Sequence, residues 1–231
     1  MKGNMNLKCT NCGNELDANE IDDKKVVAGK VICWDCFYGI LGEEIEKHPL
    51  GGHLRPTASK SKPVRDPQEI LNFLSGKGVD AYGRSIYETL SWSDKQLEQC
   101  HSQVQWVFPL HEESRHAEVY PIITPEIVEM AKKFPVIEEN LRLAKERFEN
   151  FYGLEPYDEE ARQAQWCVDR NHNLLRITRI IRSLRLFGMD DDAADFYGKV
   201  RFVGDKFKIS VTTLRYWLKA YRDDVWNTLL D

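Results

Sequence analysis

Four cysteines near the start of the chain have the spacing of a metal site. Cys9 and Cys12 form one C-x-x-C pair, and Cys33 and Cys36 form a second. Each pair can place two thiolates on one ion, so the two pairs together complete a tetrahedral sulfur shell. A redox dithiol uses the same kind of pair, but two pairs at this separation favour zinc. We therefore expect a structural Zn²⁺ with four thiolate ligands and no open coordination position for catalysis.

The residues around the cysteines indicate a small zinc module at residues 1–46. Gly13 follows the first pair and suits a tight knuckle, because glycine tolerates positive φ. The second pair runs into the apolar residues of a short helix, and we expect strands around 24–27 and 30–32. A knuckle, a β-hairpin and a cysteine pair that opens a helix resemble the zinc-ribbon and treble-clef families. So small a module is expected to draw its folding energy from the metal.

A second set of chemically capable side chains lies on two predicted helices in the later part of the chain. The first helix is expected from Ser93 to Phe108, where Pro109 stops it. At 100° per residue, one side of it is polar, and the polar side chains are Asp94, Glu98, His101 and Gln105. On the second helix one face carries His172, Arg176, Arg179 and Ser183, opposite an apolar face that packs inward.

These two polar stripes allow two interpretations. In the first, arginines and carboxylates pair across the helices and only hold them in register. In the second, the stripes line a pocket for a small anion or a peptide carboxylate, with Arg176 and Arg179 as bidentate donors. Arg84, in a glycine-rich connection, could add a further cation to that pocket.

The elements that position these residues are predicted to be helical from residue 67 onward. Residues 47–66 are rich in Gly, Pro, Ser and Lys and predict a flexible basic linker. Helix starts and stops follow from cap residues, prolines and glycines, namely Ser93, Thr124–Glu126, Pro135, Gly153, Asp158, Gly188, Asp190 and Ser210. We therefore expect a mainly α protein, with a zinc-ribbon module at 1–46, a linker at 47–66 and an all-helical domain at 67–231.

Composition and charge restrict the classes of function. The 231 residues carry a net charge of −5, and residues 1–46 hold five lysines against nine acidic residues. Because phosphate binding needs clustered cations, the zinc module is a poor candidate for nucleic-acid binding. No apolar run approaches the roughly 18 residues of a membrane span, and no signal peptide is visible. We expect a cytoplasmic protein, or a nuclear one in a eukaryote, in which Cys100 and Cys167 are small buried hydrophobes.

The helical part resembles the opioid growth factor receptor conserved-domain family over roughly residues 67–225. The matching segments are Phe73–Asp80, Gly83–Arg84, Trp92–Asp94, Leu97–Glu98, His101, Val104–Leu110, Pro121–Thr124 and His172–Leu184. The resemblance implies a helical domain. Family members in animals are described as receptors for an enkephalin peptide, linked to the nucleus and to growth restraint.

Three classes of function are consistent with these observations. We favour a zinc-binding, non-catalytic protein that binds a protein, a peptide or a small anion. An enzyme with His101 and His172 as acid–base groups is a second class, although no H-E-x-x-H or G-x-S-x-G motif is present. A nucleic-acid protein that uses the basic linker and the arginines of 176–185 is a third class.

Overall fold

The structure is a computed structural model that describes residues 26–27, 30–31, 62–114, 117–154 and 160–227. The chain divides into two compact units, Met1–His53 and Leu54–Asp231. In the first unit, strands β1 (Val26–Val27) and β2 (Lys30–Val31) pair antiparallel, with Val26 opposite Val31. These strands fall where the sequence predicts the hairpin. The four cysteines lie outside the described residues.

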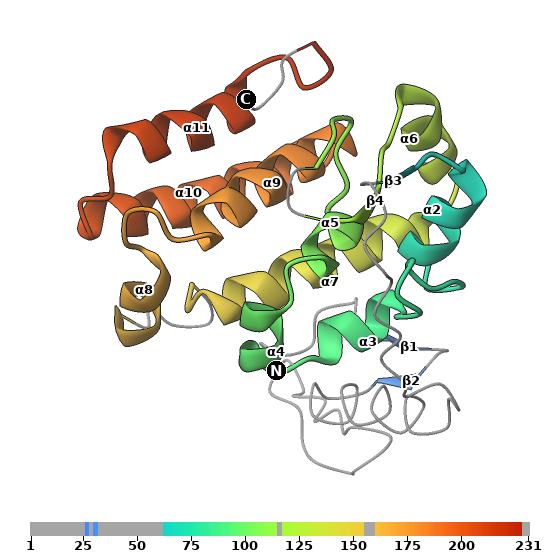
Figure 1. The fold of residues 1–231 in the computed structure, drawn as a ribbon, viewed down its shortest axis with the longest axis horizontal. Coiled ribbons are helices and arrows are strands. Elements are labelled where there is room, and N and C mark those ends of the chain that lie inside the picture. The colour runs from blue at the N-terminus through green and yellow to red at the C-terminus, as the bar shows by residue number, and fades with distance from the viewer. Residues whose placement is uncertain (1–25, 28–29, 32–61, 115–116, 155–159, 228–231) are drawn as a thin grey trace, which may run out of the picture. The chain divides into compact units, whose positions relative to one another are not determined.

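The described part of the second unit is mainly helical, as predicted (Figure 1). Its helices are α2 (Pro67–Leu74), α3 (Ile86–Ser91), α4 (Asp94–Gln99), α5 (Gln103–Val107), α6 (Pro125–Ala131), α7 (Pro135–Phe151), α8 (Glu160–Trp166), α9 (Asn173–Leu186), α10 (Asp190–Lys206) and α11 (Val211–Arg222). Helix α9 packs against α10 and α11, and α7 packs against α10, α2 and α3.

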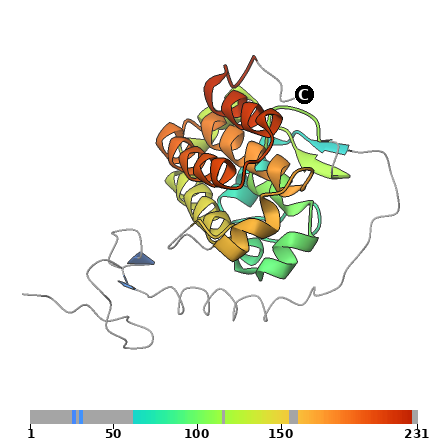
Figure 2. The same ribbon diagram turned by 90° about the vertical axis from the view of Figure 1, so that its left-hand side faces the viewer.

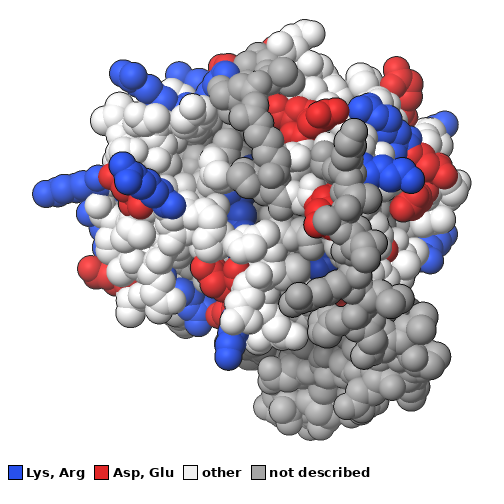
Figure 3. Space-filling model, in the orientation of Figure 1, with Lys and Arg blue, Asp and Glu red and all other residues white. Residues whose placement is uncertain are grey.

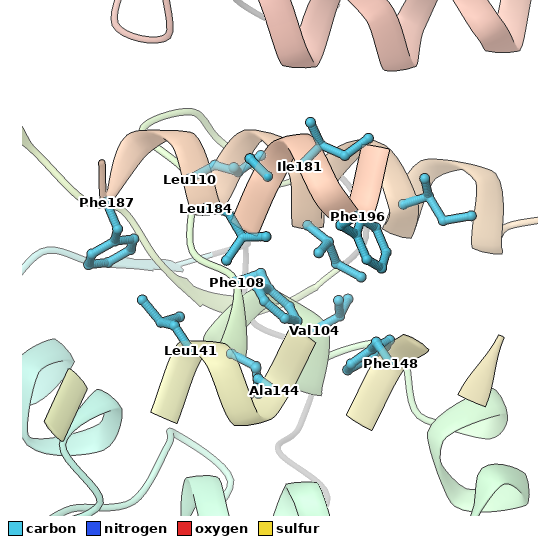
Figure 4. Close-up of a cluster of buried hydrophobic side chains, with 14 of the residues drawn as sticks. Val104, Phe108, Leu110, Leu141, Ala144, Phe148, Ile181, Leu184, Phe187 and Phe196 are labelled. Carbon is cyan, nitrogen blue, oxygen red and sulfur yellow. The ribbon is translucent and has the colours of Figure 1, made fainter. Parts of the chain in front are cut away.

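A continuous hydrophobic core fills the space between α9 and α7. In Figure 4, Phe108 and Val104 lie between the two helices, with Ile181 and Leu184 of α9 on one side and Leu141 of α7 on the other. All five side chains are buried. The sequence predicts one inward face on α9, but polar side chains outside that face are buried too, because α10, α11 and the chain after α5 cover the rest of this helix.

The prediction of a single helix from Ser93 to Phe108 is wrong in its middle. Ser93 caps α4 with both hydrogen bonds of a capping box, and Phe108 follows the last residue of α5, as predicted. Between them, the chain leaves the helical path at Cys100–Ser102. Apolar residues at helical spacing run through this break, so the pattern alone does not reveal it.

Two short strands also depart from the all-helical expectation. Strand β3 (Lys62–Val64) pairs parallel with β4 (Val119–Pro121), with Lys62 opposite Val119. Figure 2 shows the two strands side by side at the edge of the helical unit. Residues 62–64, which the sequence places in the flexible linker, are therefore part of the helical unit.

Most of the predicted helix ends are confirmed. Thr124 and Ser210 cap α6 and α11, and α7 starts at Pro135. Gly153 and Gly188 follow α7 and α9 with positive φ. Asp190 differs from the prediction, because it is the first residue of α10 and Met189 takes the cap position. Asp158 lies outside the described residues.

Candidate functional site

The break between α4 and α5 is held by an arginine from α9. Arg176 is 5% exposed and donates to the backbone oxygens of Leu97 at 3.0 Å and Cys100 at 2.9 Å. A weaker bond reaches the oxygen of Glu98 at 3.4 Å. Carbonyls at the end of a helix have no partner within the helix. Arg176 therefore supplies from another helix the donors that the end of α4 lacks.

A second arginine reaches the same break from the chain that precedes α3. Arg84 donates to Cys100 Sγ at 3.0 Å and to Ser102 Oγ at 3.1 Å. Its Nε binds the Asp80 carboxylate at 2.7 Å, and this carboxylate also accepts the backbone N–H groups of Tyr82 and Arg84. Asp80 is 3% exposed, so its charge is compensated entirely within the protein.

Cys100 is not the small buried hydrophobe that the sequence predicts, because it is only partly buried and accepts a hydrogen bond from Arg84. Burial by itself raises the pKa of its thiol, but the hydrogen bond with Ser102 and the charge of Arg84 outweigh that effect, so the pKa lies below its ordinary value of 9.0. Cys167 does match the prediction, because it is buried and burial raises its pKa to about 11.

Two histidines meet beside Arg176. The rings of His101 and His172 lie edge to face with centroids 4.8 Å apart. His172 Nε2 is 3.3 Å from Glu98 Oε1, but not in hydrogen-bonding geometry. The other Glu98 oxygen accepts Asn173 Nδ2 at 3.0 Å. Burial, and then the positive charge of Arg176, lower the pKa of His172.

The structure therefore brings together part of the predicted set. Glu98, His101, His172 and Arg176 meet at one place, and Arg84 reaches the other side of the same break. The remaining three predicted residues, Asp94, Gln105 and Arg179, lie elsewhere.

These three residues have their own surroundings. Asp94 pairs with Arg147 at 2.7 Å and with Arg162 at 3.3 Å. Gln105 is 5% exposed, and its side-chain oxygen has no partner among the described residues. Arg179 donates to the backbone oxygen of Phe108 at 3.0 Å, and burial lowers its pKa to about 10.

Neither interpretation of the stripes describes the contacts fully. The stripes do hold helices in register, but Arg176 and Arg179 bind backbone carbonyls rather than carboxylates. A guanidinium bonded to several carbonyls is a structural brace, since its donors are already in use. The strip 176–185 is also a poor nucleic-acid surface, because Arg176 and Arg182 point into the protein. On the face in Figure 3, the described basic and acidic side chains are interspersed.

Sequence reasoning missed a second polar cluster on α9. Arg182 is fully buried and donates to the backbone oxygen of Asp224 at 3.4 Å, and Arg185 donates to that of Asp223 at 2.9 Å. The ring of His111 lies 5.7 Å from that of Trp226. The sequence does hold one sign of this burial. The apolar residues of α9 are spread over more than half of its circumference, which indicates a helix that is buried on several sides.

Comparison with known proteins identifies the family. The family model described as the opioid growth factor receptor (OGFr) conserved region matches residues 80–225. This match covers more than half of the chain, which therefore belongs to the OGFr conserved-region family. No solved structure matches the chain significantly.

Curated relatives agree with this assignment. The opioid growth factor receptor of Homo sapiens is 34% identical over 115 residues, which cover 43% of this chain and 16% of the human protein. The Mus musculus receptor is 33% identical over 148 residues, covering 57% of this chain and 23% of the relative. Opioid growth factor receptor-like protein 1 of Xenopus tropicalis is 28% identical over 145 residues, covering 56% and 28%. The chain thus matches less than a third of the length of each relative.

Two further observations concern metals and membranes. Within the described ranges, no group of three or more His, Cys, Asp or Glu side chains is arranged to hold a metal ion. None of the described helices is both long enough and apolar enough to cross a membrane.

Proposed function

We propose that this chain is a non-catalytic binding protein whose helical unit recognises a peptide or a protein. The observation that carries the proposal is the family match over residues 80–225, because relatives with this region are named as growth factor receptors. The contacts at the α4–α5 break support it. Arg176 and Glu98 are engaged in bonds within the protein, as befits a rigid scaffold.

A direct test is calorimetric titration of the full chain with an enkephalin peptide, with a scrambled peptide of the same composition as the control. Saturable binding of the first peptide alone is the expected result. Equal heats from both peptides would contradict recognition of this peptide.

An enzyme remains the second candidate, and one observation favours it. The contact between His101 and His172 beside Glu98 resembles a pair of acid–base groups. A His172→Gln variant distinguishes the two candidate functions, because glutamine keeps a polar side chain but cannot exchange protons near neutral pH. If the protein is a binder, His172→Gln should leave peptide affinity within about twofold of wild type, whereas an enzyme should lose its turnover.

We also propose a structural zinc ion bound by Cys9, Cys12, Cys33 and Cys36. Because four zinc-bound thiolates require a reducing compartment, we propose that the protein is located in the cytoplasm or the nucleus. The support is the spacing of the two cysteine pairs. Elemental analysis of purified protein should find one zinc per chain. A Cys33→Ser variant should lose it and Cys167→Ser should keep it, since Cys167 is buried in the helical unit. Zinc well below one equivalent in the wild type would refute the site.

A further inference from the structure

The guanidinium of Arg182 is buried, and three of its five N–H donors have no partner among the described residues. Its side chain is fully buried, and Nη1 donates to the backbone oxygen of Asp224 at 3.4 Å. Within the described residues, Nε and Nη2 make no hydrogen bond. These two nitrogens lie on one edge of the planar group and form the fork that matches the two oxygens of a carboxylate. Leaving such donors unpaired in the interior is costly.

A second unpartnered group lies near this fork. Both ring nitrogens of His111 are buried and make no hydrogen bond within the described residues. Burial lowers the pKa of His111, the charge of Glu112 opposes this, and Arg182 is close enough for its charge to lower the pKa further, so that the pKa lies below its ordinary value. His111 is therefore neutral at pH 7 and offers one N–H donor.

The fold explains why these groups meet. After α5 the chain runs along α9, where the oxygens of Phe108 and Pro109 accept bonds from Arg179 and Ser183 (Figure 1). This path carries His111 toward Arg182. From the other side, residues 223–227 close over α9, with the oxygen of Asp224 on Arg182 and the Trp226 ring against His111.

Charges of both signs surround the fork. Glu112, Asp223 and Asp224 all act on Arg182 and oppose the approach of further negative charge, while Arg179 and Arg185 lie on the same side of the helix. A doubly charged phosphate would meet twice the repulsion from these acids and also twice the attraction of the arginines, so the ligand is distinguished by shape rather than by charge. The flat fork of Nε and Nη2 matches the two coplanar oxygens of a carboxylate.

We propose that Arg182 and His111 form a carboxylate-binding site between α9, the 108–114 segment and the 223–227 segment. The carboxylate would accept two N–H bonds from the Arg182 fork and one from His111. As a site for a peptide's carboxylate this inference rests on the proposed binding function, although the site itself can be tested without any partner. Because Arg182 is fully buried, entry requires residues 223–227 to move, and Trp226 reports that movement.

The experiment titrates the full chain with N-acetylglycine, with its uncharged analogue N-acetylglycinamide as the matched control, and follows tryptophan fluorescence and thermal unfolding. A site of this size should give saturable binding at about 1–10 mM, since so small a ligand has a low ceiling of affinity. Acetate should bind more weakly if the peptide portion of the probe also makes contacts. Inorganic phosphate should not saturate, and saturation by phosphate alone would overturn the assignment to a carboxylate.

Three variants locate the response. Arg182→Lys keeps the charge but removes the fork and should weaken binding at least tenfold. Arg182→Met should abolish binding. Arg201→Lys, at an exposed ion pair with Asp205, should bind as wild type does. Equal responses from wild type and both Arg182 variants would overturn the proposal.

The proposal and the binding function fail in different ways. If N-acetylglycine gives no saturable response, the fork bonds a buried water only, and the carboxylate site is refuted. If an enkephalin peptide binds wild type and Arg182→Lys equally well, the proposed function stands, and the site is refuted as the place where the peptide's carboxylate binds. Loss of both peptide and N-acetylglycine binding in Arg182→Lys supports both proposals.

Discussion

Replacement of Arg176 by methionine tests whether the α4–α5 break depends on this side chain. Methionine fills a similar volume, so the change removes the hydrogen bonds and the charge with little loss of packing. The backbone oxygen of Cys100 loses its partner at 2.9 Å, and an orphaned buried carbonyl costs about 1–3 kcal/mol. The oxygen of Leu97 loses its bond at 3.0 Å and keeps only the weaker one from Gln103 Nε2 at 3.4 Å. Removing a buried guanidinium recovers part of its desolvation cost. We expect a net loss of about 2 kcal/mol.

The assay is urea unfolding followed by circular dichroism at 222 nm, which reports mainly on the helical unit. A loss of about 2 kcal/mol moves the midpoint downward at an unchanged slope. Arg201→Met is the matched control, because its ion pair with Asp205 is exposed and should be worth less than about 1 kcal/mol. An Arg176→Met protein as stable as wild type, or more stable, would refute the idea that this arginine braces the break.

Three further predictions concern the same region and its neighbours. Asp80→Ala should cost about 3–5 kcal/mol in urea unfolding, since it leaves the largely buried Arg84 without its carboxylate. Asp66→Ala removes only a helix cap and should cost about 1 kcal/mol. Gly76→Ala should lower the melting temperature by several degrees, because Gly76 has φ +76° and an added methyl group would overlap the Tyr87 ring; an unchanged melting temperature would contradict the described packing. The pKa of His172 lies below its ordinary 6.5, so the stability that this residue contributes is present above pH 6.5 and is lost as the pH falls through the folded-state pKa. His172→Gln should therefore reduce the loss of stability between pH 7.5 and 5.5. An identical loss in both proteins would be evidence against this pKa shift.

Local signals were enough to place most helix ends. Ser93, Thr124 and Ser210 each accept a bond from the backbone N–H group three residues ahead, and this chemistry needs no distant partner. The prolines and glycines that stop helices act in the same local way. Such features follow from a few consecutive residues, and the structure has them where the sequence predicts them.

Features that depend on distant contacts were not accessible from sequence. The break at Cys100–Ser102 is stabilised by Arg84 and Arg176, and Arg176 lies more than seventy positions further along the chain. The strands β3 and β4 are only three residues long and give no alternating pattern. Helical periodicity placed Glu98 and Arg176 on facing stripes, but it could not reveal that the arginine binds carbonyls instead of the carboxylate.

The pairing of β3 with β4 determines where a shortened form of this protein has to begin. A fragment that starts at Pro67, the boundary suggested by the sequence, lacks the residues that pair with Val119–Pro121. Its β4 backbone would be left with unpaired N–H and C=O groups beside buried Tyr120, which is a common origin of aggregation during expression. Truncations for crystallisation or NMR should therefore retain Lys62–Val64.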